Sequence, residues 1–146
     1  MNDLQADLLA NLRRYAQGAA GLSPSLHAVI DHGRPYLGIA RPKGYRKRSY
    51  RKCFYNAGRL ALDNRGTYVE GYAATIGPPF GIFIHHAWVT LDSEHAIDVT
   101  WDNAAGCGYV GIAFPVESPI RQISTKSEAP APIRGQSEAL FTRRSV

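Results

Sequence analysis

The sequence predicts an α+β fold in which an N-terminal helix and a second, cysteine-bearing helix pack on an antiparallel sheet. Three observations predict it: apolar residues recur at helical spacing over residues 4–15, a second helical pattern begins at Cys53, and alternating segments follow between residues 68 and 114. The chain has 146 residues, 45% of them hydrophobic, which is enough to bury one core. We therefore expect a single domain over residues 1–117.

The first helix is expected to begin after Asn2 or Asp3, whose side chains can cap it, and to end at Gly18. Two short apolar runs follow at residues 26–30 and 36–40, separated by Asp-His-Gly-Arg-Pro. Turn-forming residues between short apolar runs are typical of a hairpin. The sequence thus predicts two strands joined by a turn after the first helix.

The second helix is expected over residues 53–63, and four strands are expected at residues 68–75, 82–91, 95–99 and 109–114. The segment at 95–99 should pair with the strand at 82–91 through a tight turn at residues 92–94. From residue 118 the periodicity is lost and prolines recur. Residues 118–146 are therefore predicted to be a loosely ordered or wrap-around tail.

Several classes of protein are disfavoured by composition. No apolar run approaches the roughly 20 residues of a membrane span, and the N-terminus lacks the pattern of a signal peptide. We therefore expect a cytoplasmic protein that does not bind membranes. In that reducing compartment a disulfide between Cys53 and Cys107 is not expected. No CxxC pair or His/Cys ligand spacing is present, so neither a metal nor another cofactor is predicted.

Positive charge is concentrated in one stretch. Residues 41–59 contain eight basic residues and no acid, whereas the rest of the chain contains nine basic residues and twelve acids. Seven lie in the basic loop, residues 41–52: Arg41, Lys43, Arg46, Lys47, Arg48, Arg51 and Lys52. This loop is either a solvated connection, a contact for nucleic acid or nucleoprotein with Tyr45 and Tyr50 stacking on bases, or a source of charge that favours a thiolate at Cys53. The third interpretation is the preferred one.

Cys53 is a candidate nucleophile. A free thiol has a pKa near 8.5, so a reactive cysteine needs a setting that stabilises the thiolate. The N-terminus of a helix provides such a setting, and Cys53 follows Arg51 and Lys52 at the start of a predicted helix. The alternative for any single cysteine is a buried, inert side chain.

His86 is the candidate base. Side chains alternate along a strand, so His86 shares a face with Ile84 and Trp88, and Trp88 would shield it from water. Across a turn centred at 93, residues 86 and 98 lie nearly level, so Asp98 is expected within a residue or so of the position opposite His86. A carboxylate there would orient the imidazole ring.

Five further residues are candidates for substrate binding or for stabilising an oxyanion: Tyr50, Asn56, Glu70, Trp88 and Trp101. The backbone N–H of Cys53 is another oxyanion donor to consider. Four of these five side chains have a local alternative. Glu70 can pair with the basic loop, Asn56 can hydrogen-bond around the helix start, and the two tryptophans can be core or pocket wall.

The order of these residues resembles that of a known group of enzymes. Cys53 in Arg-Lys-Cys-Phe is followed by Tyr-Val-Glu-Gly-Tyr, by His-Ala-Trp-Val from His86, and by Asp-Val-Thr-Trp from Asp98. Over residues 50–114 this is similar to the transglutaminase-like branch of the papain-fold cysteine enzymes, whose order arylamine N-acetyltransferases share. The resemblance implies a papain-like, transglutaminase-like fold with Cys53 as nucleophile, His86 as general base and acid, and Asp98 as the orienting residue.

The predicted function is therefore that of a cysteine-dependent hydrolase or acyl or amide transferase working through a thioester acyl-enzyme. Its partner would be a protein or small-molecule acyl donor, and peptidase, deamidase and acyltransferase reactions all remain open. The alternative is a small accessory or inhibitor protein of phage or mobile-element type. Such a protein would bind nucleic acid or nucleoprotein through residues 41–52 and would have lost the chemistry.

Overall fold

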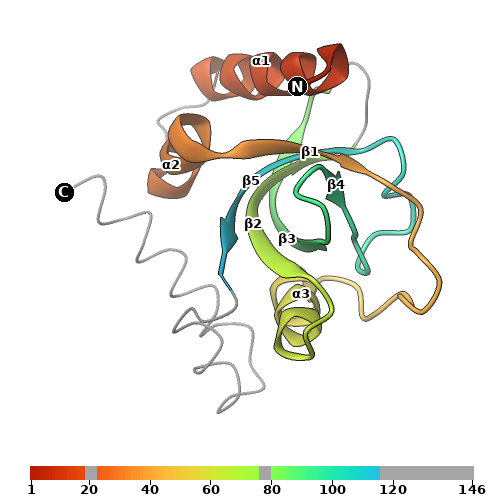
Figure 1. Ribbon diagram of the computed structural model, residues 1–146. Coiled ribbons are helices and arrows are strands. Elements are labelled where there is room, and N and C mark those ends of the chain that lie inside the picture. The colour runs from red at the N-terminus through yellow and green to blue at the C-terminus, as the bar shows by residue number, and fades with distance from the viewer. Residues whose placement is uncertain (19–22, 76–79, 116–146) are drawn as a thin grey trace.

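The computed structural model describes residues 1–18, 23–75 and 80–115; the tail predicted at 118–146 lies outside them. The described residues form three helices and a curled five-stranded sheet, which is an α+β structure (Figure 1). In chain order the elements are α1 (Asp3–Gly18), α2 (Pro24–His32), β1 (Arg34–Gly38), α3 (Cys53–Leu62), β2 (Thr67–Ala74), β3 (Phe83–Thr90), β4 (His95–Ala96) and β5 (Gly108–Phe114).

Helix α1 forms where its spacing and caps predict it. The Asn2 side chain accepts the Gln5 backbone N–H and the Gln5 side chain accepts the Asn2 N–H, both at 2.9 Å, in a reciprocal capping arrangement. Leu8, Leu12 and Ala16 recur every four residues and are buried. The structure therefore confirms the predicted first helix.

The hairpin predicted over residues 26–40 is wrong, because its first half is helix α2. The Ser23 hydroxyl accepts the Leu26 backbone N–H at 3.1 Å, and Pro24 stands at the first helical position. Leu26 and Val29 lie on the buried face. The Ser-Pro cap thus starts a helix, and only the residues from Arg34 form a strand.

The sheet has the order β3-β2-β5-β1-β4 and is mixed. The β3–β2, β2–β5 and β5–β1 pairs are antiparallel, whereas β4 pairs parallel to β1, with Leu37 opposite His95. The prediction of an antiparallel sheet is therefore wrong for the β1–β4 pair. A two-residue strand that leaves its hairpin partner can align with whichever edge it reaches, and here that edge is β1.

The predicted pairing of residues 95–99 with the strand at 82–91 is reduced to one antiparallel bridge between Val89 and Ile97. These two residues are symmetric about position 93, so the predicted register is correct although the hairpin is short. The bridge joins the two ends of the strand order. It therefore makes the sheet curl back on itself.

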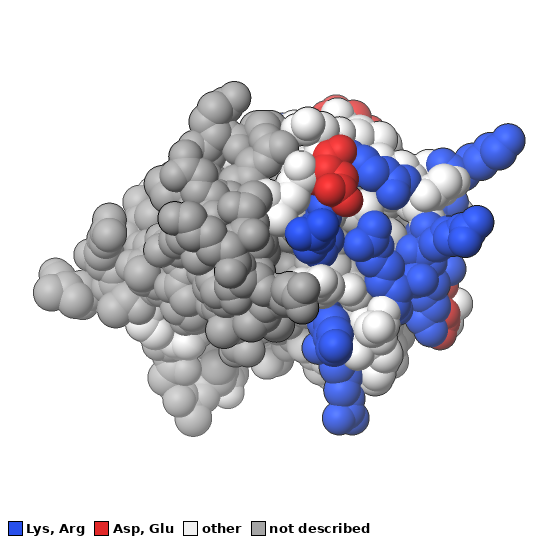
Figure 2. Space-filling model, turned by 90° about the horizontal axis from the view of Figure 1, so that it is seen from below, with Lys and Arg blue, Asp and Glu red and all other residues white. Residues whose placement is uncertain are grey.

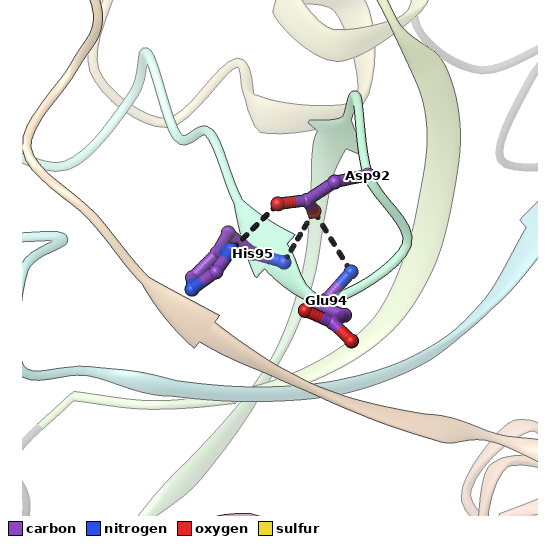
Figure 3. Close-up of side chains that lie close together, drawn as sticks. All are labelled: Asp92, Glu94 and His95. Atoms are coloured by element: carbon purple, nitrogen blue, oxygen red, sulfur yellow. Dashed lines mark hydrogen bonds and ion pairs between the residues drawn. The ribbon is translucent and has the colours of Figure 1, made fainter.

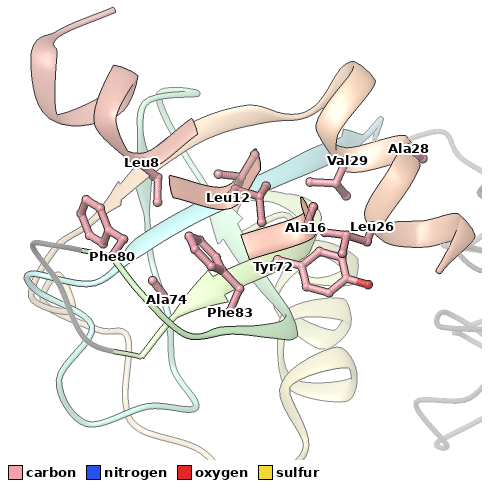
Figure 4. Packing of buried hydrophobic residues seen from close by; sticks show 11 residues of the cluster. Leu8, Leu12, Ala16, Leu26, Ala28, Val29, Tyr72, Ala74, Phe80 and Phe83 are labelled. Carbon is pink, nitrogen blue, oxygen red and sulfur yellow. The ribbon is translucent and has the colours of Figure 1, made fainter. Parts of the chain in front are cut away.

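The two faces of the curled sheet have different neighbours. Helices α1 and α2 pack on the outer face around Tyr72 and Phe83 (Figure 4), and α3 packs on the same face farther along, near Tyr68. The inner face is filled by a separate cluster that includes Trp88 and Tyr109. Because His86 alternates with Ala87 on β3, its side chain lies on the inner face.

Candidate active site

Cys53 is the first residue of α3 and is 8% exposed. The preceding residue, Lys52, makes no side-chain capping hydrogen bond to the helix. Arg51, two residues before the cysteine, has a φ of 67°, a left-handed conformation that is strained for a residue with a side chain. The backbone thus turns sharply to place the sulfur at the positive end of the helix dipole.

His86 lies on β3 and is 2% exposed. Its Nε2 donates to Asp98 Oδ2 at 2.8 Å. Burial disfavours the charged ring, but the hydrogen bond and charge of Asp98, together with the nearby Cys53, outweigh it and raise the pKa of His86 to about 9. Since Nε2 is engaged by Asp98, Nδ1 is the nitrogen left for the sulfur.

Asp98 is fully buried and accepts four hydrogen bonds. Besides His86, the Tyr109 hydroxyl donates to Oδ2 at 2.8 Å, and the backbone N–H groups of Thr100 and Trp101 donate to Oδ1 at 2.8 and 3.2 Å. Burial alone would raise the pKa of Asp98, but the hydrogen bonds and charge of His86 lower it, with the other donors adding to that effect. A carboxylate so held is ionised and fixed in orientation.

The indole of Trp101 covers the imidazole. Its ring is stacked on that of His86 with the centroids 4.0 Å apart and an angle of 24° between the planes. Trp88, predicted to shield His86, lies instead among Tyr36 and Tyr109 in the inner cluster. Two residues along β3 is about 7 Å, so Trp88 is one layer deeper, whereas Trp101 follows Asp98 directly and folds over the ring.

Asn56 is a brace between α3 and the segment that contains Asp98. Its side-chain nitrogen donates to the Ser49 carbonyl and to the Thr100 hydroxyl, both at 2.9 Å. Both amide hydrogens are therefore used within the protein. Asn56 therefore hydrogen-bonds around the helix start, which was the alternative to a role in substrate binding. These bonds connect the start of α3 to the segment that contains Asp98.

Glu70 lies on the other face of the sheet. It pairs with Ala87 on β3, so its carboxylate shares a face with His85 and not with His86. The carboxylate is fully buried, accepts from the Tyr68 hydroxyl at 2.7 Å, and lies 3.1 Å from the His85 ring. The structure thus turns Glu70 away from His86, onto the face that α3 covers, and its carboxylate partners are Tyr68 and His85 and not residues of the basic loop.

An open cleft of about 310 Å³ borders the stacked pair. Its lining includes Trp101, Tyr50, whose ring is largely exposed, and Ile84, which precedes His86 by two residues on the same strand face. Cys107 also lines it and donates to the Asn103 carbonyl at 3.0 Å. Burial, with the nearby charge of Asp98, raises the pKa of the Cys107 thiol, so this second sulfur remains protonated at neutral pH.

The basic loop is attached to the body of the protein at several points. Arg41 donates to the Trp101 carbonyl at 3.1 Å, the Arg48 backbone N–H donates to the Val99 carbonyl at 2.7 Å, and Lys47 forms an ion pair with Asp102 at 2.9 Å. The exposed basic residues of the loop are Lys43, Arg46, Lys47, Arg51 and Lys52. Figure 2 shows Lys and Arg side chains gathered on one face of the molecule.

Asp92, Glu94 and His95 bring three potential metal ligands together at the turn after β3 (Figure 3). The Asp92 oxygens already accept the backbone N–H groups of Glu94 and His95, each at 2.8 Å, and a ring nitrogen of His95 at 2.6 Å. These hydrogen bonds close the turn, in agreement with the prediction that Asp92 and Glu94 are turn residues. We assign the cluster this structural role.

Of the predicted site residues, the structure brings together Cys53, His86 and Asp98, with Trp101 over them. Sequence reasoning did not find Tyr109 or the stacking of Trp101 on His86. Strand alternation places Tyr109 on one face of β5, but it does not say what that face meets. No protein-family model, curated protein or solved structure matches this chain. Within the described residues, no helix is both long and apolar enough to span a bilayer.

Proposed function

We propose that the protein is a cysteine-dependent hydrolase or acyl transferase that forms a thioester on Cys53. The observation that carries the proposal is the buried His86 ring, which is fixed by Asp98 at 2.8 Å and lies near enough to Cys53 for that residue to help raise its pKa. A nucleophile, a base in contact with it, and a third group orienting the base are the parts that such catalysis requires. A papain-like, transglutaminase-like arrangement of helix and strands belongs to the same proposal.

The arrangement supports a two-step reaction. His86 holds the proton of the thiol, and the sulfur attacks the carbonyl carbon of an amide, ester or thioester while the carbonyl electrons move to oxygen. The bond to the leaving group then breaks, and the leaving group takes the proton from His86. Water or an acceptor amine next gives a proton to His86 and attacks the thioester, which releases the acyl group and restores the sulfur.

Each supporting residue has a defined part in this scheme. Asp98 stabilises the imidazolium that carries the proton between the two steps, and Tyr109 holds the Asp98 carboxylate in place. Trp101 covers one side of the ring, which excludes water from the ion pair and strengthens it. The backbone N–H of Cys53, at the first position of α3, is the candidate donor to a developing oxyanion.

Alkylation by iodoacetamide tests the activated thiol. The assay uses a Cys107→Ser background, so that Cys53 is the reacting sulfur, and Cys53→Ala gives the blank. An ordinary thiol reacts roughly seventyfold faster at pH 8 than at pH 6, because its thiolate fraction grows by that factor. For Cys53 paired with His86 we expect a nearly flat profile over this range, and a steep one in His86→Ala.

The shape of the profile is the readout, because burial of Cys53 changes the absolute rate at all pH values. Circular dichroism of each variant checks that the fold is kept. An equally steep pH dependence with and without His86 would show that the thiol is not paired with the ring, and the proposal would then fail.

A further inference from the structure

A second cleft, of about 480 Å³, opens beside the proposed active site. It is lined by Arg41, Arg46 and Lys47 from the basic loop on one side and by Asp102 and the following residues on the other. Three cations therefore face one carboxylate across the cleft. A cleft lined in this way attracts negatively charged groups.

The cations of this cleft differ in how they are engaged. Arg41 is bound to the Trp101 carbonyl, and Lys47 is paired with Asp102. In that ion pair the two side chains are 40% and 68% exposed, so the pair is weak and an incoming carboxylate can compete for Lys47. Arg46 is exposed, and the structure pairs it with no carboxylate of the described residues.

The two clefts are neighbours. Asp102 and Asn103 line both the 480 Å³ cleft and the 310 Å³ cleft beside Trp101. Arg41 connects them further, because it lines the first and hydrogen-bonds the backbone of Trp101, whose ring stacks on His86. A molecule lying across Asp102 and Asn103 would therefore contact the cations at one end and the covered imidazole at the other.

We propose that the 480 Å³ cleft is a specificity subsite for an acidic side chain, Asp or Glu, of a peptide substrate. This inference rests on the proposed function, since it makes the substrate of Cys53 an acidic peptide. Arg46 and Lys47 bind the substrate carboxylate, and Asp102 competes with it for Lys47. The substrate then continues past Asn103 into the cleft bordered by Trp101 and Tyr50.

The same observations argue against nucleic acid as the occupant. Base stacking needs an open aromatic face, but the guanidinium of Arg65 lies 4.6 Å from the centre of the Tyr45 ring and the Tyr45 hydroxyl donates to the Arg65 carbonyl. Tyr50 is 65% exposed, with the Arg51 guanidinium 5.8 Å from the centre of its ring, but it lines the smaller cleft and not the basic one. A concave site with cations and one acid suits a single carboxylate better than a run of phosphates.

Fluorescence anisotropy of labelled peptides tests the subsite without requiring turnover. The protein is the full chain with Cys53→Ala, and the probes are a short peptide with three glutamates, the same peptide with glutamines, and a single-stranded DNA of equal charge. We expect the glutamate peptide to bind roughly tenfold tighter than the glutamine peptide, and this preference to weaken between about 50 and 200 mM salt.

Variants of the charged residues in the cleft show which side chains cause the preference for the glutamate peptide. Arg46→Gln and Lys47→Gln should each remove most of the preference for glutamate, whereas Asp102→Asn should increase it by freeing Lys47. Arg13→Gln is the matched control, because Arg13 is exposed on α1 and lines neither cleft. It changes the net charge equally and should leave binding unaltered.

Three results would overturn the inference: equal binding of the two peptides, equal effects of Arg46→Gln and Arg13→Gln, or tighter binding of the DNA that depends on Arg46. Failure of the proposed function gives a different pattern. In that case iodoacetamide would show an ordinary thiol while the glutamate preference and its dependence on Arg46 remain. An activated thiol without the preference would leave the proposed function in place and remove the subsite.

Discussion

Replacing Asp98 by asparagine removes the negative charge that holds the imidazolium, and the loss can be measured as a change in pH-dependent stability. In the folded protein the pKa of His86 is raised from 6.5 to about 9. Each pKa unit corresponds to about 1.4 kcal/mol, so the full shift represents about 3 kcal/mol. Cys53 contributes to the same shift, so we expect Asp98→Asn to abolish about 2 kcal/mol of it.

The free energy of unfolding falls as the pH rises, because folding raises the pKa of His86. The folded protein binds the His86 proton more tightly than the unfolded chain, so this stabilisation is fully present below about pH 6.5 and is lost as the pH rises through about 9. Urea unfolding between about pH 6 and pH 9.5 measures it. The wild-type free energy of unfolding should fall by about 2 kcal/mol more than that of Asp98→Asn.

Other groups also titrate over this pH range. Their contributions to the free energy of unfolding are the same in the wild type and in Asp98→Asn, so they cancel in the comparison. Loss of the Tyr109 hydrogen bond in Asp98→Asn lowers stability at every pH and does not change the slope. His86→Gln is the matched control and should show a flatter profile than Asp98→Asn, because it also removes the part of the shift that Cys53 contributes. If the wild-type and Asp98→Asn curves are parallel, Asp98 does not hold a charged ring and the reasoning is refuted.

Three further changes test other parts of the structure. Tyr109→Phe removes one donor to a buried carboxylate, so urea unfolding should show a loss of about 1.5–3 kcal/mol, and an unchanged stability would exclude the hydrogen bond to Asp98. Arg51→Gly should be about 1 kcal/mol more stable than Arg51→Ala, because a left-handed φ of 67° costs glycine little; equal midpoints of unfolding would count against the strained turn before Cys53. Gly71→Ala should prevent folding, since its methyl group would overlap backbone atoms of β5, and a native circular dichroism spectrum would contradict this close approach.

Local patterns predicted the parts of the structure that depend on neighbours in sequence. The spacing of Leu8 and Leu12 predicted α1, and the turn at residues 92–94 predicted the register in which Val89 meets Ile97. The same register predicted that His86 and Asp98 would lie close, and their side chains are 2.8 Å apart. Periodicity and turn chemistry act within a few residues, so they can be read without the fold.

The sequence also contains a helix signal before α2. Ser23 and Pro24 form a typical helix start, although the short apolar run after them by itself predicts a strand. A run of five apolar residues fits either element. The cap formed by Ser23 and Pro24 is the feature that distinguishes a helix from a strand here.

The sequence by itself determined which residues could supply a thiol, an imidazole and a carboxylate, and it fixed the relation of His86 to Asp98 through a countable turn. Only the tertiary structure decided that Cys53 lies near enough to His86 to influence its pKa, that Trp101 and not Trp88 covers the ring, and that Glu70 faces away from His86. These contacts depend on the curl of the sheet and on the packing of α3 across its rim. Such packing joins residues far apart in the sequence, such as Cys53 and His86, and no local pattern specifies it.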